Sequence, residues 1–541
     1  MVITKKLIYK DNIYINIYYF DMDKETFYTS TPSYASEIQK EFLFDDEKIS
    51  KQLDINNGSY SSGELNFGSL SALTASDTLV NWDQSTLEIP IVMTLAEAAT
   101  AGFTATSVAD EKVNSQLMTQ KNSNTIHINS IRLDMNGESI ISYQNNTALK
   151  CNYELLSSFN SSDAVEMSNS NFAVDTSGSI THSATSNKGV GLLANSTTLN
   201  KGLEERLKNI NFYAPAHPLT DTSTVNATRK SHINVSDADK VVLFYLCHIP
   251  LNQLHDLFRK MPLTKGVEYN LSFQLNTAAS CVLTTAPTSS NLTYSSTTQY
   301  GTFPYMITDQ TSKLKADKKY TMSASIAKNG VYSHPIQKCA LNVKTYKLTP
   351  STESAYFKDA NRLVRYEDCQ IYDTQKSIAP GSYVNTLLNS SINKLRKLVI
   401  LPFMSATDSL LSGVTTGSKS PFSCEPASCS PFAFISDIEI KLSDKSVYSN
   451  RQNYSYEQYQ LECVNQNGSR TGLVTQEMFD SGYGMVVVDL SKHSKTEDMA
   501  PKSVYVSFKN SAAYTCDYVM LLYFENSIGV NVVTGNVKRS P

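Results

Sequence analysis

One irregular pattern of apolar residues occurs twice in this chain of 541 residues. In "INSIRLDMNGESIIS" (128–142) the apolar residues are Ile128, Ile131, Leu133 and Met135, and in "ISDIEIKLSDKSVYS" (435–449) they are Ile435, Ile438, Ile440 and Leu442. Both copies take one step of three residues and then two steps of two, whereas a regular strand alternates with a period of two. The shared irregularity predicts a β-bulge at the same place in two related strands.

Each copy of this pattern continues in the same way. Polar residues that favour a turn come next, Asn136-Gly137-Glu138 in the first copy and Ser443-Asp444-Lys445 in the second. A short helix is expected beyond each turn, over 145–159 and over 453–466. Strand, turn and helix therefore all recur, which predicts two domains built alike.

Further short strands are predicted in both halves, in the same order. They are 63–70, 87–95, 125–135, 241–249, 266–275 and 340–349 in the first half, and 366–374, 397–404, 435–442, 485–491, 503–509 and 517–525 in the second. Another short helix is expected over 250–261. Short strands separated by polar turns are typical of β-sandwiches, so we expect an all-β fold with short helices.

The strand order also suggests how the chain is divided. Residues 1–55 are expected to form an N-terminal arm, in which "IYINIYYF" (13–20) can form a strand. The first β domain is expected over 56–350 and the second over 351–541. Two long insertions rich in Ser, Thr and Asn, 157–235 and 277–330, interrupt the first domain and are expected to be surface loops.

Composition excludes several classes of protein. Only 18% of the residues are charged and the net charge is −4, so direct binding to nucleic acid is not expected. No stretch reaches the roughly 20 apolar residues that span a bilayer. The first 21 residues lack the cleavage site of a signal peptide, so we expect a protein that folds inside the cell and is not secreted.

The cysteines support a reducing compartment. There are nine, an odd number, and they are scattered: Cys151, Cys247, Cys281, Cys339, Cys369, Cys424, Cys429, Cys463 and Cys516. Cys247 and Cys463 are expected to be buried thiols, and Cys424 and Cys429 a structural thiol pair rather than a metal site or a disulfide.

No motif in the sequence carries catalytic chemistry. His248 and His255 are seven residues apart, too far for a helical metal pair, and are expected to cap or pack. Asp134 and Glu138 are interpreted as solvated turn carboxylates, and Trp82 as a core residue. We therefore predict no catalytic, cofactor-binding or metal-binding residues, no cofactor and no enzyme activity.

Four segments, taken in order, resemble a known family. They are "GELNFGSLSALTASDTLVNWDQSTLEIPIVMTL" (63–95), "INSIRLDMNGESII" (128–141), "CHIPLNQLHDLFRKMPLTKGVEYNLSFQLN" (247–276), and a C-terminal series of "KLVILPF", "SPF", "NYSYEQY" and "VVVDLSK". Together they resemble the double jelly-roll major capsid proteins of polinton-like viruses and virophages, in the lineage of adenovirus hexons. The resemblance covers roughly residues 60–540.

This resemblance implies two tandem eight-stranded jelly rolls in one chain. It further implies a homotrimeric, pseudo-hexagonal capsomer of a double-stranded DNA virus, tiling an icosahedral shell in the virion beside penton and minor cement proteins. The 31 Tyr, 21 Phe and low charge suit extensive contacts between identical subunits. In this setting the 250–261 helix could brace the two barrels or two subunits. The alternative is a viral spike or surface adhesin, a β-sandwich protein that binds a glycan or a receptor.

Overall fold

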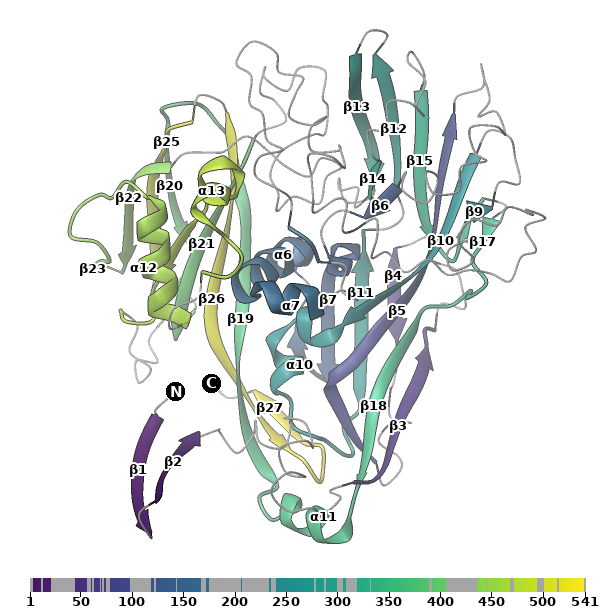
Figure 1. Cartoon of the computed structure of the whole chain (residues 1–541), viewed down its shortest axis with the longest axis vertical. Helices are drawn as coiled ribbons and strands as arrows, with labels where there is room; N and C mark the ends of the chain where they lie inside the picture. The colour runs from purple at the N-terminus through teal and green to yellow at the C-terminus, as the bar shows by residue number, and fades with distance from the viewer. Residues whose placement is uncertain are drawn as a thin grey trace.

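Two β-sandwiches lie side by side in the computed structural model (Figure 1). The structure describes residues 3–10, 13–20, 44–55, 60, 63–68, 70, 73, 78–97, 118–120, 123–142, 144–166, 172–174, 206, 233–234, 240–276, 279–286, 289–298, 305–307, 319–330, 332–388, 392–404, 435–443, 445–467, 471–493, 501–512 and 515–539. Every strand that the sequence predicts within 56–541 overlaps a strand of these two sandwiches, and the segment 13–20 forms a strand of a separate hairpin.

The first sandwich is an eight-stranded jelly roll with two facing antiparallel sheets. One sheet has the order β3 (Phe44–Leu53), β18 (Ala340–Leu348), β5 (Leu79–Glu97) and β10 (Lys240–Pro250). The other has the order β4 (Glu64–Phe67), β11 (Tyr269–Leu275), β7 (Ile128–Met135) and β8 (Glu138–Ile141).

Smaller strands extend or accompany the first jelly roll. They are β9 (Ile233–Asn234) beside β10, β15 (Lys319–Ile326), β12 (Ala279–Ala286) and β13 (Ser289–Thr298) in succession from β5, and the pairs β6 (Met118–Gln120) with β14 (Tyr305–Ile307) and β16 (Lys328–Asn329) with β17 (Tyr332–Ser333). A separate hairpin joins β1 (Ile3–Lys10) to β2 (Ile13–Phe20).

The second sandwich repeats the first. Its sheets have the orders β19 (Asn361–Ile378), β26 (Cys516–Asn531), β21 (Leu395–Met404), β24 (Val486–Asp489), and β20 (Tyr383–Leu388), β25 (Val504–Asn510), β22 (Ile435–Leu442), β23 (Lys445–Ser446). A final strand, β27 (Val537–Arg539), pairs with β26. If the eight strands of each roll are counted along the chain, both rolls have the sheets 1-8-3-6 and 2-7-4-5. The predicted fold of two tandem jelly rolls is confirmed.

The repeated pattern forms the same strand of each roll, with the predicted bulge in both. In β7, Ser130 pairs with Gln274 but the next partner, Leu275, pairs with Ile128, which leaves Asn129 as the extra residue. In β22, Ser436 pairs with Lys509 and Glu439 pairs with Ser507, so three residues of β22 span two residues of β25 and one residue is again extra. The apolar residues on both sides of each bulge are buried: Ile128, Ile131, Leu133, Met135, Ile435, Ile438, Ile440 and Leu442.

The short helices lie mainly between the strands. The two repeated helices are α6 (Thr147–Ser158) and α12 (Tyr456–Asn467), as predicted. The helix predicted over 250–261 is divided into η4 (Leu251–Gln253) and α10 (Asp256–Lys260). The others are η1 (Asn124–His127), α7 (Ser161–Glu166), α11 (Pro350–Phe357), α13 (Gln476–Met478) and η6 (Phe479–Tyr483).

The structure corrects the expected extent of the arm. Residues 44–53, assigned to the arm 1–55, form β3 and pair along β18 as the first strand of the first jelly roll. Five of its ten residues are charged, because β3 is an edge strand whose outer face is exposed, and edge strands commonly carry charge. The sequence of β3 therefore lacks the apolar alternation that predicted the other strands.

The insertion at 277–330 is also corrected. It is not only loop, because β12, β13, β14 and β15 lie within it and β15 pairs with β5. Their Thr-rich sequences, such as "SSNLTYSSTT" in β13, are compatible with a pleated strand because Thr is β-branched. Most of the 157–235 insertion lies outside the described residues.

The two rolls share part of one hydrophobic core. The ends of β19, β26 and β27 that lie nearest the first roll contribute buried residues to the first roll's core: Val364, Tyr366, Ile528, Val530 and Val537. Trp82 is buried in the same core against Tyr269 and Phe258, as predicted for a core residue. The second roll has its own core between its two sheets. The long β19–β26 ribbon therefore belongs to both rolls (Figure 1).

Candidate functional site

The junction between the two jelly rolls combines an apolar cluster with a group of polar contacts. Helices α6 and α10 of the first roll lie against β19 and the adjoining face of the β19–β26–β21–β24 sheet of the second (Figure 1). The two surfaces differ: the first roll offers helices and the second offers a strand and a sheet face. The contact is therefore heterologous in the sense used for subunit interfaces.

Apolar side chains of α6 fill much of this junction. Leu149, Tyr153 and Leu156 are buried in one cluster with Val399 and Tyr523 of the second roll. The second roll's own helix, α12, covers the same sheet face, and its Tyr459 and Cys463 belong to that cluster. Fully burying an aliphatic or aromatic side chain contributes roughly 1.5–3 kcal/mol, so this cluster is a major attachment between the rolls.

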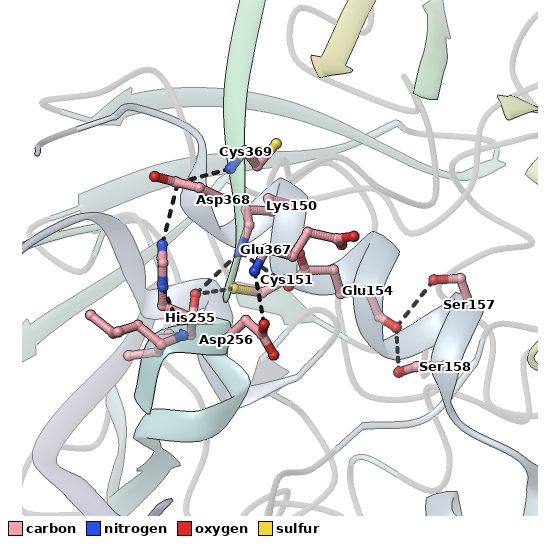
Figure 2. A network of polar contacts seen from close by, with 12 residues as sticks. Lys150, Cys151, Glu154, Ser157, Ser158, His255, Asp256, Glu367, Asp368 and Cys369 are labelled. Atoms are coloured by element: carbon pink, nitrogen blue, oxygen red, sulfur yellow. Dashed lines mark hydrogen bonds and ion pairs between the residues drawn. The ribbon is translucent and has the colours of Figure 1, made fainter. Parts of the chain in front are cut away.

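Polar contacts connect α10 with β19 beside this apolar cluster (Figure 2). Asp256 accepts a hydrogen bond of 2.9 Å from the backbone N–H of Glu367. His255 Nε2 lies 3.4 Å from Asp368 Oδ1, which also accepts from the backbone N–H of Cys369 at 2.8 Å. These contacts fix the position of the first roll along the edge of β19.

The charges of both aspartates are stabilised at the junction. Burial alone would raise the pKa of Asp256, but Arg259, Lys260 and the Glu367 N–H outweigh it and lower that pKa. Burial acts in the same direction on Asp368, and its hydrogen bond and charge interaction with His255 lower its pKa below the ordinary value. Both carboxylates are therefore matched to partners across or beside the junction.

A buried lysine lies in the same region. Lys150 Nζ is 3.1 Å from the Glu154 carboxylate and 3.4 Å from the Leu254 carbonyl oxygen, to which it donates. Burial would lower the pKa of Lys150, but Glu154 and the nearby thiols of Cys151 and Cys369 outweigh this and raise it. A buried charge is tolerated only with such partners, and both Glu154 and the Leu254 carbonyl belong to the first roll, whereas Cys369 belongs to the second.

The structure places most of the residues that the sequence analysis considered for chemistry. His255 caps α10 by accepting from the backbone N–H of Leu257, as predicted, and His248 is half-buried near Glu88. Asp134 pairs with Arg132 beside its turn, and Glu138 is exposed. Cys247 and Cys463 are buried free thiols, as predicted, whereas Cys424 and Cys429 lie outside the described residues.

Neither metal-ligand clusters nor membrane-spanning helices occur in the described ranges. Within them, no group of three or more His, Cys, Asp or Glu side chains is arranged to hold a metal ion. None of the helices there has the length and apolar character needed to cross a membrane.

The expected brace over 250–261 contacts the second roll through polar side chains. Leu254 and Phe258 point into the first roll's own core and are buried there. The contacts with β19 are made instead by His255 and Asp256. Sequence reasoning missed both contacts, because Asp368 is one of several charged residues of β19 and the Glu367 backbone N–H has no sequence signature.

The two rolls of matching strand order, joined by this junction, define a double jelly-roll protein. In its fold the chain is similar to a chain of the Sputnik virophage structure, with a TM-score of 0.51 and 12% identity over 92% of this chain and 89% of that one. The resemblance predicted from the sequence is thus confirmed at the level of the fold.

Two further solved structures are similar at lower TM-scores. The Faustovirus major capsid protein has a TM-score of 0.42 and 11% identity, covering 90% of this chain and 91% of that one. A chain of the PBCV-1 virus capsid has a TM-score of 0.39 and 9% identity, covering 93% and 98%. No protein-family model and no curated protein sequence matches this chain.

Proposed function

We propose that this chain is the major capsid protein of a double-stranded DNA virus. Three copies would form a pseudo-hexagonal capsomer that tiles an icosahedral shell. The observation that carries the proposal is the duplicated jelly roll, in which both halves have the same strand order and are joined through unlike surfaces. The fold likeness to a chain of the Sputnik virophage, at a TM-score of 0.51, supports the same assignment.

The heterologous junction between the two rolls supports the formation of a closed ring by several chains. When one surface of a unit binds a different surface of the next, repetition of that contact produces either a closed ring or an open filament. Each chain already contains two such units and one such contact. Three chains would supply six similar units, and closure of the ring would require the same kind of contact between chains.

The same proposal places the protein in the virion as a structural component without enzymatic activity. Its partners would be neighbouring capsomers, penton proteins and minor cement proteins, and the low net charge of −4 argues against direct contact with the genome. Residues ahead of β3 would form an arm beneath the shell, in contact with adjacent capsomers.

Size-exclusion chromatography with light scattering tests the proposal directly. The purified protein is expected to have a mass of about 180 kDa, three times its chain mass of 59.9 kDa. Negative-stain images should then show flat particles of hexagonal outline. A stable monomer or dimer at micromolar concentration would reject the capsomer and favour the alternative, a spike or adhesin that acts through one exposed binding site.

A further inference from the structure

The outer faces of the two first sheets carry equivalent ion pairs. In the second roll, Lys397 of β21 lies 3.1 Å from Glu367 of β19, reaching across β26. In the first roll, Lys51 of β3 lies 2.7 Å from Glu88 of β5, reaching across β18. Both pairs join the first and third strands of their roll diagonally over the eighth strand, with the signs of the charges exchanged. They mark the same place on each roll.

In the second roll this place is covered by the first roll. The ammonium group of Lys397 lies 4.4 Å from the ring centre of Tyr523 and 6.0 Å from that of Tyr153, which belongs to α6. Only 15% of the Lys397 side chain is exposed. The helix between the fifth and sixth strands of one roll therefore lies over the ion pair of the next roll.

In the first roll the β3 side of the equivalent place is open, whereas the Glu88 side chain on β5 is only 7% exposed. The side chain of Lys51 is 48% exposed. Beside it on the same strand, Ile49 is 66% exposed and Leu53 is 52% exposed, and Ile55 just beyond is 64% exposed. The register with β18 puts Ile49, Lys51 and Leu53 opposite Lys344, Asn342 and Ala340. We call this surface, defined by Ile49, Lys51, Leu53 and Ile55, the β3 face.

Helix α12, the equivalent of α6 in the second roll, also has exposed apolar residues. Helix α12 connects the fifth and sixth strands of its roll, as α6 does in the first. Its Tyr459 and Cys463 face its own roll, whereas Leu461 and Val464 are 59% and 41% exposed. In Figure 1, α12 and β3 lie on opposite sides of the chain, so one chain cannot bring them together.

We propose that α12 of one copy of the chain docks on the β3 face of the next copy, as α6 docks on the second roll within each chain. This inference rests on the proposed function, because it identifies the surfaces through which three chains close a ring. Leu461 and Val464 cover Ile49 and Leu53 and shield the Lys51–Glu88 ion pair from water. Isolated exposed apolar residues are ordinary. Here, however, the two exposed apolar surfaces occupy the positions that correspond to the junction within each chain, which indicates an interface.

Single charge substitutions on each surface test this docking. Leu53→Asp and Leu461→Asp should each abolish the trimer peak in light scattering at micromolar concentration, because each buries a carboxylate against apolar side chains. Leu387→Asp is the matched control, since Leu387 is 66% exposed but lies on β20 in the other sheet, and its trimer should persist. Circular dichroism and the urea midpoint should show that all three variants remain folded, as expected for exposed positions.

Cross-linking provides the second measurement. A Leu53→Cys, Leu461→Cys double variant treated with a short bis-maleimide should give covalent dimers and trimers on a denaturing gel. Each single variant and a Leu53→Cys, Leu387→Cys variant should stay at the background of the wild-type protein, which carries nine cysteines of its own. A covalent trimer requires that the two surfaces meet at no fewer than two of the three chain-to-chain contacts of the ring.

The outcomes separate this inference from the proposed function. A trimeric wild-type protein whose Leu53→Asp and Leu461→Asp variants both stay trimeric, or whose double cysteine variant stays at background, overturns the docking of α12 on the β3 face and leaves the capsomer standing. A wild-type protein that is monomeric at every concentration overturns both.

Discussion

At the scale of single residues, Asp256 joins the two jelly rolls through one backbone N–H. Its carboxylate is mostly buried, accepts from Glu367 across the junction and lies near Arg259 and Lys260. We expect Asp256→Asn to lower the free energy of unfolding by about 1–3 kcal/mol at pH 7, the usual cost of losing a charged hydrogen-bond acceptor. The urea unfolding midpoint measures this change, and Asp480→Asn, at an exposed position, should leave the midpoint nearly unchanged.

The same substitution should have a defined pH dependence. The pKa of Asp256 is lowered in the folded protein, so its carboxylate stabilises the fold above the unfolded-state pKa of about 3.9 and loses that effect as the pH falls through the folded value. The difference between wild type and Asp256→Asn is therefore expected to be largest near pH 7 and to shrink below about pH 4. An equal difference at pH 7 and pH 3 would show that the charge of Asp256 is not involved.

Gly472 marks a second point where the two rolls touch. Its φ of +67° is left-handed, and an added Cβ would lie 2.5 Å from the carbonyl carbon of Ser157 and also against Leu156 O, at the end of α6. Gly381 has a similar φ of +76° but open space around it. Gly381→Ala should cost only the left-handed strain of about 1–2 kcal/mol. Gly472→Ala should lower the urea midpoint clearly further, because backbone cannot move aside as a flexible side chain can.

At the scale of elements, β3 changes how an N-terminal deletion should be designed. Removing residues 1–40 leaves all of β3, so the first roll should fold with an unchanged urea midpoint, and any defect should appear only in particle assembly. Removing residues 1–50 deletes Phe44 to Ser50, most of the strand that pairs with β18. That variant should be insoluble or clearly destabilised. Equal stability of both deletions would contradict the assignment of β3 to the first roll.

Elements with a regular apolar pattern could be predicted from the sequence, and the irregular β7 and β22 could be predicted because they are irregular in the same way. A bulge shifts the buried face by one residue, so Ile128 and Ile131, like Ile435 and Ile438, must be three apart to stay in the core. By contrast β3 was missed, because an exposed edge strand needs no apolar alternation.

Most contacts of the junction between the two rolls could not be predicted from the sequence, for a different reason. Lys150 lies in an ordinary amphipathic helix and Asp256 in an ordinary first turn. Their partners, the Leu254 carbonyl and the Glu367 N–H, are backbone groups, which have no sequence signature. Tyr366 and Ile528 fall within 351–541, the range expected for the second roll, but are buried in the first roll's core, because β19 and β26 extend past the boundary between the rolls.

At the scale of the whole molecule, this exchange of core residues couples the two rolls. Five apolar residues of the β19–β26–β27 ribbon fill the first roll's core: Val364, Tyr366, Ile528, Val530 and Val537. At roughly 1.5–3 kcal/mol for each buried side chain, their removal would cost on the order of 10 kcal/mol, as much as the total stability of many domains. The first roll therefore depends on the second for its stability, although each roll has a complete set of eight strands.

This dependence predicts one cooperative unfolding transition for the chain. Trp82 is the only tryptophan and lies in the first roll's core, so its fluorescence reports on that roll, whereas far-ultraviolet circular dichroism reports on the strands of both. Because the ribbon cannot leave one core while remaining in the other, urea unfolding followed by the two probes should coincide at a fixed protein concentration. A circular dichroism transition without a change in Trp82 fluorescence would show that the second roll unfolds by itself and that the shared core does not couple them.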